Sequence, residues 1–164
     1  MAIERRDLFA YLDELGIATV TIEHEAMFTV AESQALRGTL AGAHTKNLFL
    51  RDTDNRLVLV VAKEDTTVDL KNLAKRLGLG RFSFGKPEQM KATLGVEPGS
   101  VTALALMHPG SAALSTVVVD EALLAHAEVN CHPLDNHATT RLAMTDLLRF
   151  IQACGHQPEI LPLQ

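Results

Sequence analysis

The sequence predicts a mixed α/β domain, and two kinds of pattern lead to this fold class. Amphipathic segments with the spacing of helices alternate along the chain with short runs, rich in Val, Ile and Thr, that are typical of strands. Some strand-like runs are joined by turns too short for a crossover helix, so the sheet should not be purely parallel. We assign residues 1–164 to one domain, because this length is typical of a single core.

The first half of the chain predicts two helices and a strand, followed by a β-hairpin. The helices are expected at 4–15 and 29–36, the strand at 18–24, and the hairpin strands at 47–51 and 57–62. The first helix carries one apolar stripe and ends at Gly16, and the second opens with capping-box spacing. The DTDN segment between the two hairpin strands has the composition of a turn.

The second half predicts three further helices among short strands. The helices are expected at 68–78, 86–95 and 145–155. Gly78 and Gly95 close the first two, and Thr145 is the expected N-cap of the third. The strands are expected at 81–84, 101–107, 115–120, 127–133 and 139–144.

Composition and cysteine content indicate a cytosolic chain with reduced thiols. No apolar run approaches the roughly 18–20 residues that span a bilayer, so we expect no membrane contact. The amphipathic N-terminus lacks the apolar region of a signal peptide. Cys131 and Cys154 are too few for a disulfide framework.

Charge is distributed unevenly along the chain. The net charge of −5 argues against a protein that coats nucleic acid non-specifically. The segment 71–91 nevertheless carries six Lys and Arg residues against the single acid Glu88. A local basic face suits a partner that carries phosphates. The alternative is an ordinary solvated helix face beside acids from elsewhere in the chain.

Lys46 is the first candidate for chemistry, because it opens an apolar strand where a charge is unexpected. A lysine there can pack its stem on the sheet and point its ammonium into a cleft. Such a charge can bind a phosphate or polarise an ester. A surface lysine whose ammonium reaches solvent is the alternative interpretation.

Two other segments carry candidate groups. Gly99 lies in a turn whose backbone N–H groups can form an anion-binding nest, although a plain turn is the common case. The segment 130–140 contains Cys131 and His132, but its spacing matches no standard zinc site. Neighbouring strand residues point to opposite faces, so these two side chains should not form a nucleophile–base pair. His132 is therefore read as a cleft-lining group or as a core histidine.

The order and spacing of these segments resemble a known family. The motifs on which this resemblance rests are HEAMFTVAES, HTKNLFLRD, DLKNLAKRLG, RFSFGKPEQMKATLGVEPGSVTALAL and NCHPLDNHATT. Together they resemble the YbaK-like aminoacyl-tRNA editing family, over roughly residues 5–160. Within it the chain looks most like the free-standing prolyl-tRNA deacylases, which remove alanine mischarged onto tRNA for proline. The resemblance implies a barrel-like mixed sheet wrapped by helices, and hydrolysis of the ester between an amino acid and the terminal ribose.

The resemblance also implies roles for individual residues. Lys46 matches the family's essential lysine, which would engage the terminal adenosine and orient the ester. Gly99 begins a segment that matches the mobile glycine loop, and His132 matches a histidine near the substrate; we expect these three to be catalytic. The expected substrate-binding residues are Met27, Phe28, Val30, Asn47, Ser100, Val101, Thr102 and Asp120. The family has proline at the fifth loop position, where this chain has Ala103, a departure that bears on loop rigidity and amino-acid preference.

The expected mechanism needs no metal, no cofactor and no covalent intermediate. The ribose carries a hydroxyl next to the ester that can help activate water, so the protein has mainly to position the ester and stabilise charge. Selectivity is expected to be steric, because a pocket walled by Met27 and Phe28 can admit alanine and exclude the larger proline.

Expected partners follow from the same interpretation. The basic segment should face tRNA through Lys71, Lys75, Arg76 and Arg81. The substrate would be aminoacylated tRNA for proline, with prolyl-tRNA synthetase as a candidate docking partner, and the protein is expected to be a monomer. Two alternatives stay open: a deacylase for Cys-tRNA or another small aminoacyl-tRNA, and a non-catalytic module that binds an amino acid or a synthetase.

Overall fold

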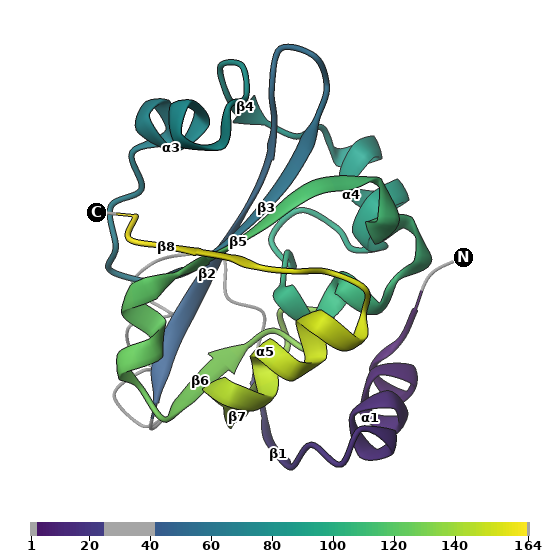
Figure 1. Cartoon of the computed structure of the whole chain (residues 1–164). Helices are drawn as coiled ribbons and strands as arrows, with labels where there is room; N and C mark the ends of the chain where they lie inside the picture. The colour runs from purple at the N-terminus through teal and green to yellow at the C-terminus, as the bar shows by residue number, and fades with distance from the viewer. Residues whose placement is uncertain (1–2, 25–41, 164) are drawn as a thin grey trace.

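The computed structural model of the chain describes residues 3–24 and 42–163 (Figure 1). Its helices are α1 (Arg5–Glu14), α3 (Leu70–Leu77), α4 (Pro87–Leu94) and α5 (Met144–Ala153). Short 3-10 segments are η1 (Ala103–Met107), η2 (Pro109–Ala113) and η3 (Glu121–Ala125). The strands are β1 (Thr19–Glu23), β2 (Ala43–Arg51), β3 (Leu57–Lys63), β4 (Ser83–Phe84), β5 (Leu114–Asp120), β6 (Glu128–Cys131), β7 (Ala138–Ala143) and β8 (Glu159–Leu161). The helix expected at 29–36 lies outside the described residues.

The strands form one eight-stranded mixed sheet, which confirms the predicted α/β class. Its order is β1-β7-β6-β2-β3-β5-β8, with β4 pairing to β2 beside that path. The pairs β2–β6, β3–β5 and β5–β8 are parallel and the others are antiparallel. In Figure 1 the strands β1, β6 and β7 lie at the lower end of the sheet, whereas β5 and β8 cross its middle. The structure therefore has the large mixed sheet with helices packed against it that the resemblance implies.

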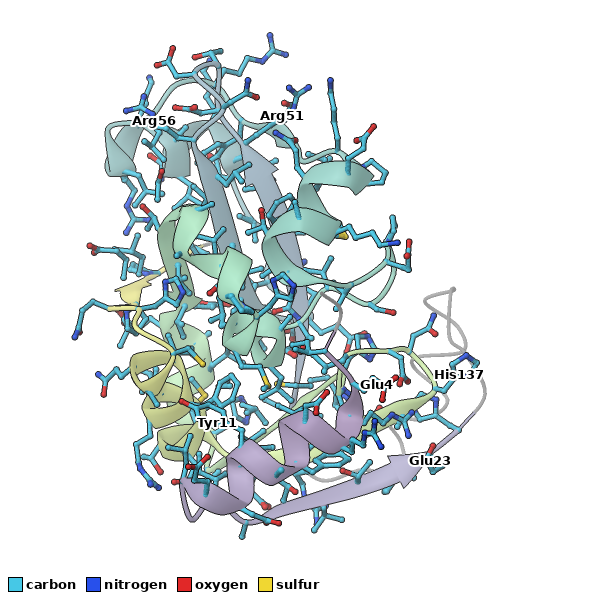
Figure 2. All side chains as sticks on the ribbon, turned by 90° about the vertical axis from the view of Figure 1, so that its right-hand side faces the viewer. Glu4, Tyr11, Glu23, Arg51, Arg56 and His137 are labelled. Carbon is cyan, nitrogen blue, oxygen red and sulfur yellow. The ribbon has the colours of Figure 1, made fainter. Side chains whose placement is uncertain are left out.

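The predicted hairpin is present, and the acid at its turn holds it closed. The buried carboxylate of Asp52 accepts hydrogen bonds from the backbone N–H groups of Asp54, Arg56 and Gly80 at 2.8–3.0 Å. Asn55 takes the left-handed conformation, with φ 59°, that turns favour in asparagine. Figure 2 shows Arg51 and Arg56 at this end of the molecule, far from Glu23 and His137.

The sheet separates two apolar cores, and β3 contributes alternate side chains to both. Leu59 and Val61 belong to the larger core, which α1, α4, α5 and η1 cover. Val58 and Val60 belong to the smaller core, which α3 covers. Tyr11 of α1 packs edge-on against a ring of α5, with centroids 5.9 Å apart. Apolar side chains therefore cover both faces of the central strands.

Two local predictions were wrong. The expected strand at 101–107 is the 3-10 segment η1, because an unbroken apolar run fits a buried helical turn as well as a strand. Thr102 caps η1 by accepting a hydrogen bond from the Leu104 N–H at 3.2 Å. Helix α5 begins at Met144 with no side-chain cap, so Thr145 lies inside its first turn. Among the described helices none is long and apolar enough to cross a membrane.

Candidate active site

Strand β2, which carries Lys46, lacks a strand partner along part of one edge. β3 pairs with β2 from Thr45 to Arg51. On the other side, β6 reaches only Ala43 and His44, and β4 reaches only the last two residues of β2. Residues 46–48 therefore form what we call the open edge of β2, without a strand partner among the residues that the structure describes.

The main chain of Asn47 points out of this open edge. The carbonyl of His44 accepts from Glu64 at 2.8 Å, so even-numbered residues of β2 exchange hydrogen bonds with β3. The carbonyl of Phe49 instead accepts from Gly85 at 2.9 Å on the β4 side. Asn47 lies two residues before Phe49, so its N–H and C=O also point away from β3, toward the open edge. Its side-chain Oδ1 is buried and has no hydrogen-bond partner among the described residues.

Lys46 lies at the same edge with an unengaged side chain. It is half-buried and stands opposite Ala62 in the β2–β3 register. Strand alternation places its side chain on the same face as Leu50, the face that α3 covers. Within 3–24 and 42–163 its ammonium forms no ion pair or hydrogen bond. The structure therefore places a free positive charge beside unpaired backbone groups.

His132 lies directly after β6, the strand that pairs with the start of β2. The parallel register sets Ala43 opposite Val129 and His44 opposite Asn130, and the pairing ends there, two residues before Lys46 on one strand and two before His132 on the other. The half-buried ring has a buried Nδ1 with no partner in the described part of the chain.

The surroundings of His132 favour a neutral imidazole. Burial lowers its pKa, and the nearby His24 lowers it further, although the backbone of Ala138 and the carboxylate of Asp135 act in the opposite direction. The ring therefore stays uncharged at neutral pH and can donate from one nitrogen and accept at the other.

The glycine loop lies on the other face of the sheet, against the larger core. Gly99 has φ 92°, a conformation that favours glycine, and the half-buried Val101 packs against that core. The N–H of Ser100 donates to Glu97 at 3.0 Å, so it is already used in the turn. Thr102 is buried and caps η1. Among the described residues, no hydrogen bond joins these loop residues to Lys46.

Of the four remaining predicted substrate-binding residues, only Asp120 lies among the residues that the structure describes. Both oxygens of the buried Asp120 carboxylate accept from backbone N–H groups, those of Lys63 and Ala122, at 3.0 Å. These hydrogen bonds join β5 to β3 and cap η3, so the geometry gives no support to a substrate contact for Asp120. Met27, Phe28 and Val30 lie outside the described residues. The chain leaves β1 for them at His24, whose N–H donates to His137 at 2.8 Å, near the His132 segment.

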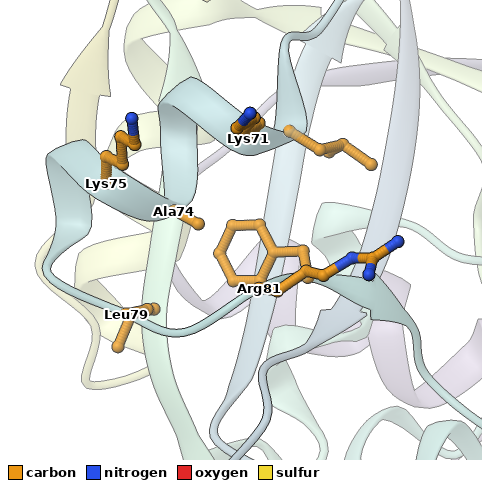
Figure 3. Close-up of a pocket in the computed structure, with 7 residues that line it drawn as sticks. Lys71, Ala74, Lys75, Leu79 and Arg81 are labelled. Carbon is orange, nitrogen blue, oxygen red and sulfur yellow. The ribbon is translucent and has the colours of Figure 1, made fainter.

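Most of the predicted tRNA-binding residues surround one hollow, which we call the basic hollow. This cavity of about 570 Å³ lies between α3 and the segment after it (Figure 3). Its apolar residues are Leu70, Ala74, Leu79 and Phe82, and its cations are Lys71, Lys75 and Arg81. These cations are exposed and form no ion pair with any described residue. Arg76 is separate, because its guanidinium donates to the carbonyl of Pro162 at 2.5 Å.

The sequence analysis missed residues that hold the site together over long distances. Arg5 bonds to Asp135 across 130 positions of the chain, and Asn130 donates from its side chain to the carbonyl of Ala43 at 3.2 Å. No local pattern marks such contacts. Among the described residues, no three His, Cys, Asp or Glu side chains gather as metal ligands would.

Comparisons with known proteins agree on one family. The profile of the aminoacyl-tRNA editing domain matches residues 24–150. The chain is 33% identical over 153 residues, 93% of each chain, to the prolyl-tRNA editing protein ProX of Acetoanaerobium sticklandii. It is 37% identical over 159 residues to the prolyl-tRNA synthetase associated domain-containing protein 1 of Danio rerio, covering 96% of this chain and 86% of that one.

A solved structure shares the fold over the whole chain. It is the crystal structure of a candidate trans-editing enzyme for prolyl-tRNA synthetase, with a TM-score of 0.75 and 22% identity. The match covers 100% of this chain and 98% of the other. With the family profile and two relatives above 30% identity, the comparison leaves one assignment. The chain belongs to the aminoacyl-tRNA editing domain family, the YbaK-like family that the motifs around Lys46, Gly99 and His132 resemble.

Proposed function

We propose that this editing domain is a trans-editing deacylase that hydrolyses the ester of Ala-tRNA(Pro). The observation that carries the proposal is the set of polar groups at and near the open edge of β2: the ammonium of Lys46, the buried Oδ1 of Asn47 and the buried Nδ1 of His132, each without a partner among the described residues. Buried polar atoms are normally paired, so unpaired ones near one strand edge fit a site that a ligand completes. The identity to a protein named for prolyl-tRNA editing supports this substrate class.

In the proposed reaction, water attacks the ester carbonyl carbon, and the bond from that carbon to the ribose oxygen breaks. Lys46 orients the ester and the terminal adenosine by its charge. Asn47 offers a backbone N–H, a C=O and a side-chain amide to the substrate. The neutral His132 ring can hydrogen-bond to the attacking water or to a ribose hydroxyl. Positioning and charge stabilisation of this kind need no protein nucleophile.

On the family resemblance, the glycine loop is proposed to contribute backbone donors to the developing oxyanion; its described residues lie on the opposite face of the sheet from the Lys46 side chain, so this contact would have to be made past the open edge of β2. Because the N–H of Ser100 is held by Glu97, this role falls to other N–H groups of the loop. Discrimination against proline is proposed to be steric, with Met27 and Phe28 as walls, because an extra methylene is worth only about 1–3 kcal/mol to a synthetase pocket built for the larger substrate.

The basic hollow is the proposed contact for tRNA phosphates. Lys46 and the hollow lie on the same face of the sheet, the face that α3 covers. Lys71, Lys75 and Arg81 are available there as free cations, whereas Arg76 is tied to Pro162. We further propose that the protein works in the cytoplasm as a monomer and docks on prolyl-tRNA synthetase.

Charge reversal tests this surface. Lys75→Glu and Arg81→Glu should each raise the KM for charged tRNA by about tenfold at low salt, with a smaller effect as salt increases. Lys91→Glu is the matched control, because Lys91 is an exposed cation outside the hollow. An equal effect of all three substitutions would assign the change to net charge and not to this surface.

Deacylation of Ala-tRNA(Pro), with Pro-tRNA and Cys-tRNA as comparisons, tests the proposed function itself. The wild type should cleave Ala-tRNA and spare Pro-tRNA, and Lys46→Ala should lose at least about 100-fold in rate. Lys63→Ala, on the neighbouring strand, is the control. Cleavage of Cys-tRNA alone would keep the chemistry and change the substrate. Binding without any cleavage would favour a non-catalytic module, and Ala103 would then be the first position to examine.

A further inference from the structure

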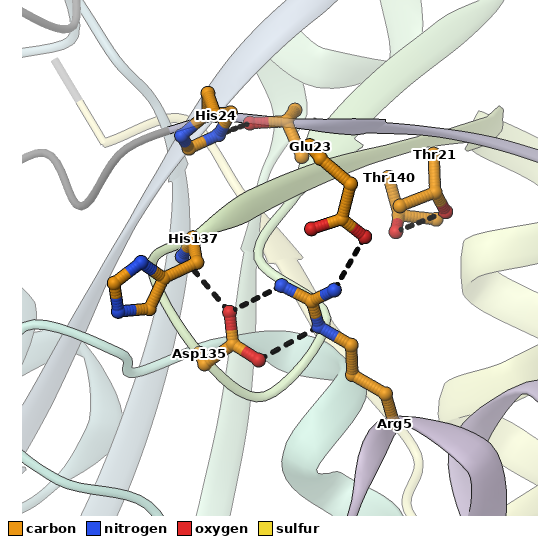
Figure 4. A network of polar contacts seen from close by, with 8 residues as sticks. Arg5, Thr21, Glu23, His24, Asp135, His137 and Thr140 are labelled. Atoms are coloured by element: carbon orange, nitrogen blue, oxygen red, sulfur yellow. Dashed lines mark hydrogen bonds and ion pairs between the residues drawn. The ribbon is translucent and has the colours of Figure 1, made fainter.

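One arginine of α1 joins three separate parts of the fold beside the candidate site (Figure 4). Arg5 donates through Nε and Nη2 to the two carboxylate oxygens of Asp135, each at 2.7 Å. Its Nη1 donates to Glu23 at 2.5 Å. All three guanidinium nitrogens are therefore engaged, and they connect the start of α1, the end of β1 and the connection from β6 to β7.

The connection from β6 to β7, residues 132–137, is strained and carries His132. Leu134 within it has φ 77° and is buried, a conformation that is uncommon in a bulky residue and costs about 1–2 kcal/mol. Such a conformation persists only where the surroundings hold it. Asp135 supplies that hold, because its carboxylate accepts from the His137 N–H at 2.8 Å and from Arg5 at the same time.

The same arginine also holds the chain where it leaves β1. Glu23 is the last residue of β1, and the next residue, His24, bonds to the far end of the 132–137 connection. Its N–H donates to the carbonyl of His137, and its Nε2 lies 2.9 Å from Oγ1 of Thr139. The segment toward Met27 therefore begins from a point that is fixed to the His132 connection.

We propose that Arg5 is a positioning residue for the deacylation site, acting through Asp135 on the connection that carries His132. The proposal rests on the function proposed above. The planar fork of arginine matches a carboxylate with two parallel hydrogen bonds, which the single ammonium of lysine does not reproduce. Arg5→Lys keeps the positive charge but loses the two parallel hydrogen bonds, so its effect on activity should be close to that of Arg5→Ala.

Arg5 also sets the electrostatic surroundings of His132. The charged groups that face this ring are Asp135 from its own connection and His24 from the end of β1. Asp135 raises the pKa of His132, and Arg5 neutralises the Asp135 charge. Removing Arg5 should therefore raise the pKa of His132, whereas removing the charge of Asp135 should lower it. Opposite shifts from the two sides of one ion pair would show that the pair acts on the His132 ring itself and not only on the stability of the fold.

Kinetics on Ala-tRNA(Pro) give the first test. Arg5→Ala and Asp135→Asn should each lower kcat by about 10- to 100-fold through misplacement of the site, with KM changed by less than about threefold. The double variant should lose no more than the stronger single variant, because both remove one interaction. Arg6→Ala is the matched control, since Arg6 is exposed on the same helix. Additive losses, or kcat within about threefold of wild type in both single variants, would overturn the proposal.

An NMR titration of the His132 ring in the full chain gives a test that needs no activity. The expected result is a raised midpoint in Arg5→Ala and a lowered one in Asp135→Asn. Unchanged midpoints in both folded variants would overturn the proposal whatever the kinetics show. If the wild type fails to cleave Ala-tRNA while the midpoints move as expected, the proposed function fails and the Arg5 network stands as a structural finding. If Arg5→Ala does not fold, Asp135→Asn and Arg5→Lys carry both measurements.

Discussion

Replacing Asn47 by leucine should make the protein more stable and less active. The Oδ1 of Asn47 is buried without a hydrogen-bond partner among the described residues, and an unsatisfied buried polar atom costs about 1–3 kcal/mol. Leucine has a similar size, and its side chain would lie on the same face as the buried Phe49. Because Asn47 as a whole is only half-buried, we take the lower end, about 1 kcal/mol. A gain of that size raises the melting temperature by about 2–4 °C in a chain of this length.

The assay compares Asn47→Leu with the same substitution on the neighbouring strand. Asn130 donates from its side chain to the carbonyl of Ala43, so Asn130→Leu should lower the free energy of unfolding by about 1–3 kcal/mol. Urea unfolding of both variants without substrate measures the two changes. Deacylation of Ala-tRNA(Pro) by Asn47→Leu should fall, because the substrate loses the side-chain amide. A loss of stability in Asn47→Leu that equals the loss in Asn130→Leu would refute the reasoning.

Three further predictions concern the electrostatics and packing of the fold. Hydrogen bonds from backbone N–H groups outweigh the effect of burial and lower the pKa of Asp52 from 3.8 to about 2. Its contribution to stability is therefore complete above pH 4 and lost between about pH 4 and pH 2. Asp52→Asn should be less stable than the wild type at pH 7. When the free energy of unfolding is measured against pH, it should fall less steeply for this variant between about pH 4 and pH 2. In Gly110→Ala the new Cβ would lie 2.0 Å from the Ala92 carbonyl oxygen, so urea unfolding should show a loss of about 1–3 kcal/mol. Burial raises the pKa of both Cys131 and Cys154 to about 12, so a thiol reagent at pH 8 should modify the fully buried Cys131 only as fast as the chain unfolds, and the half-buried Cys154 sooner.

Local patterns predicted the elements that local physics determines. Gly78 and Gly95 both end their helices in the left-handed conformation, and the DTDN turn forms the hairpin. The run 101–107 was wrongly predicted to be a strand. Every residue from Ala103 to Leu106 is buried, so no alternation of buried and exposed residues distinguishes a strand from a helical turn. Strand β8 has only three residues and pairs with β5 far earlier in the chain, so no local signal marks it.

The site was predicted as a set of residues, but its geometry was not. Sequence position singled out Lys46 and His132 as candidates and the family resemblance gave them roles, and the charge run singled out the cations of the basic hollow. The open edge of β2 depends on where β6 and β4 stop pairing, which is a property of three distant segments. Asp120, an acid at a strand end, was predicted to contact substrate; in the structure each of its carboxylate oxygens already accepts a backbone hydrogen bond.

The contrast between satisfied and unsatisfied polar groups is the strongest structural argument for the location of the site. The carboxylates of Asp52 and Asp120 are buried, and each accepts at least two backbone hydrogen bonds, so both are satisfied within the fold. Asn47, at the open edge of β2, and His132, directly after β6, each keep a buried polar atom without a partner in the described residues. The strained Leu134 lies two residues beyond that histidine. Unpaired buried polar atoms and a strained backbone are expected where a region is selected for a ligand and not for stability, which supports the proposed location of the site.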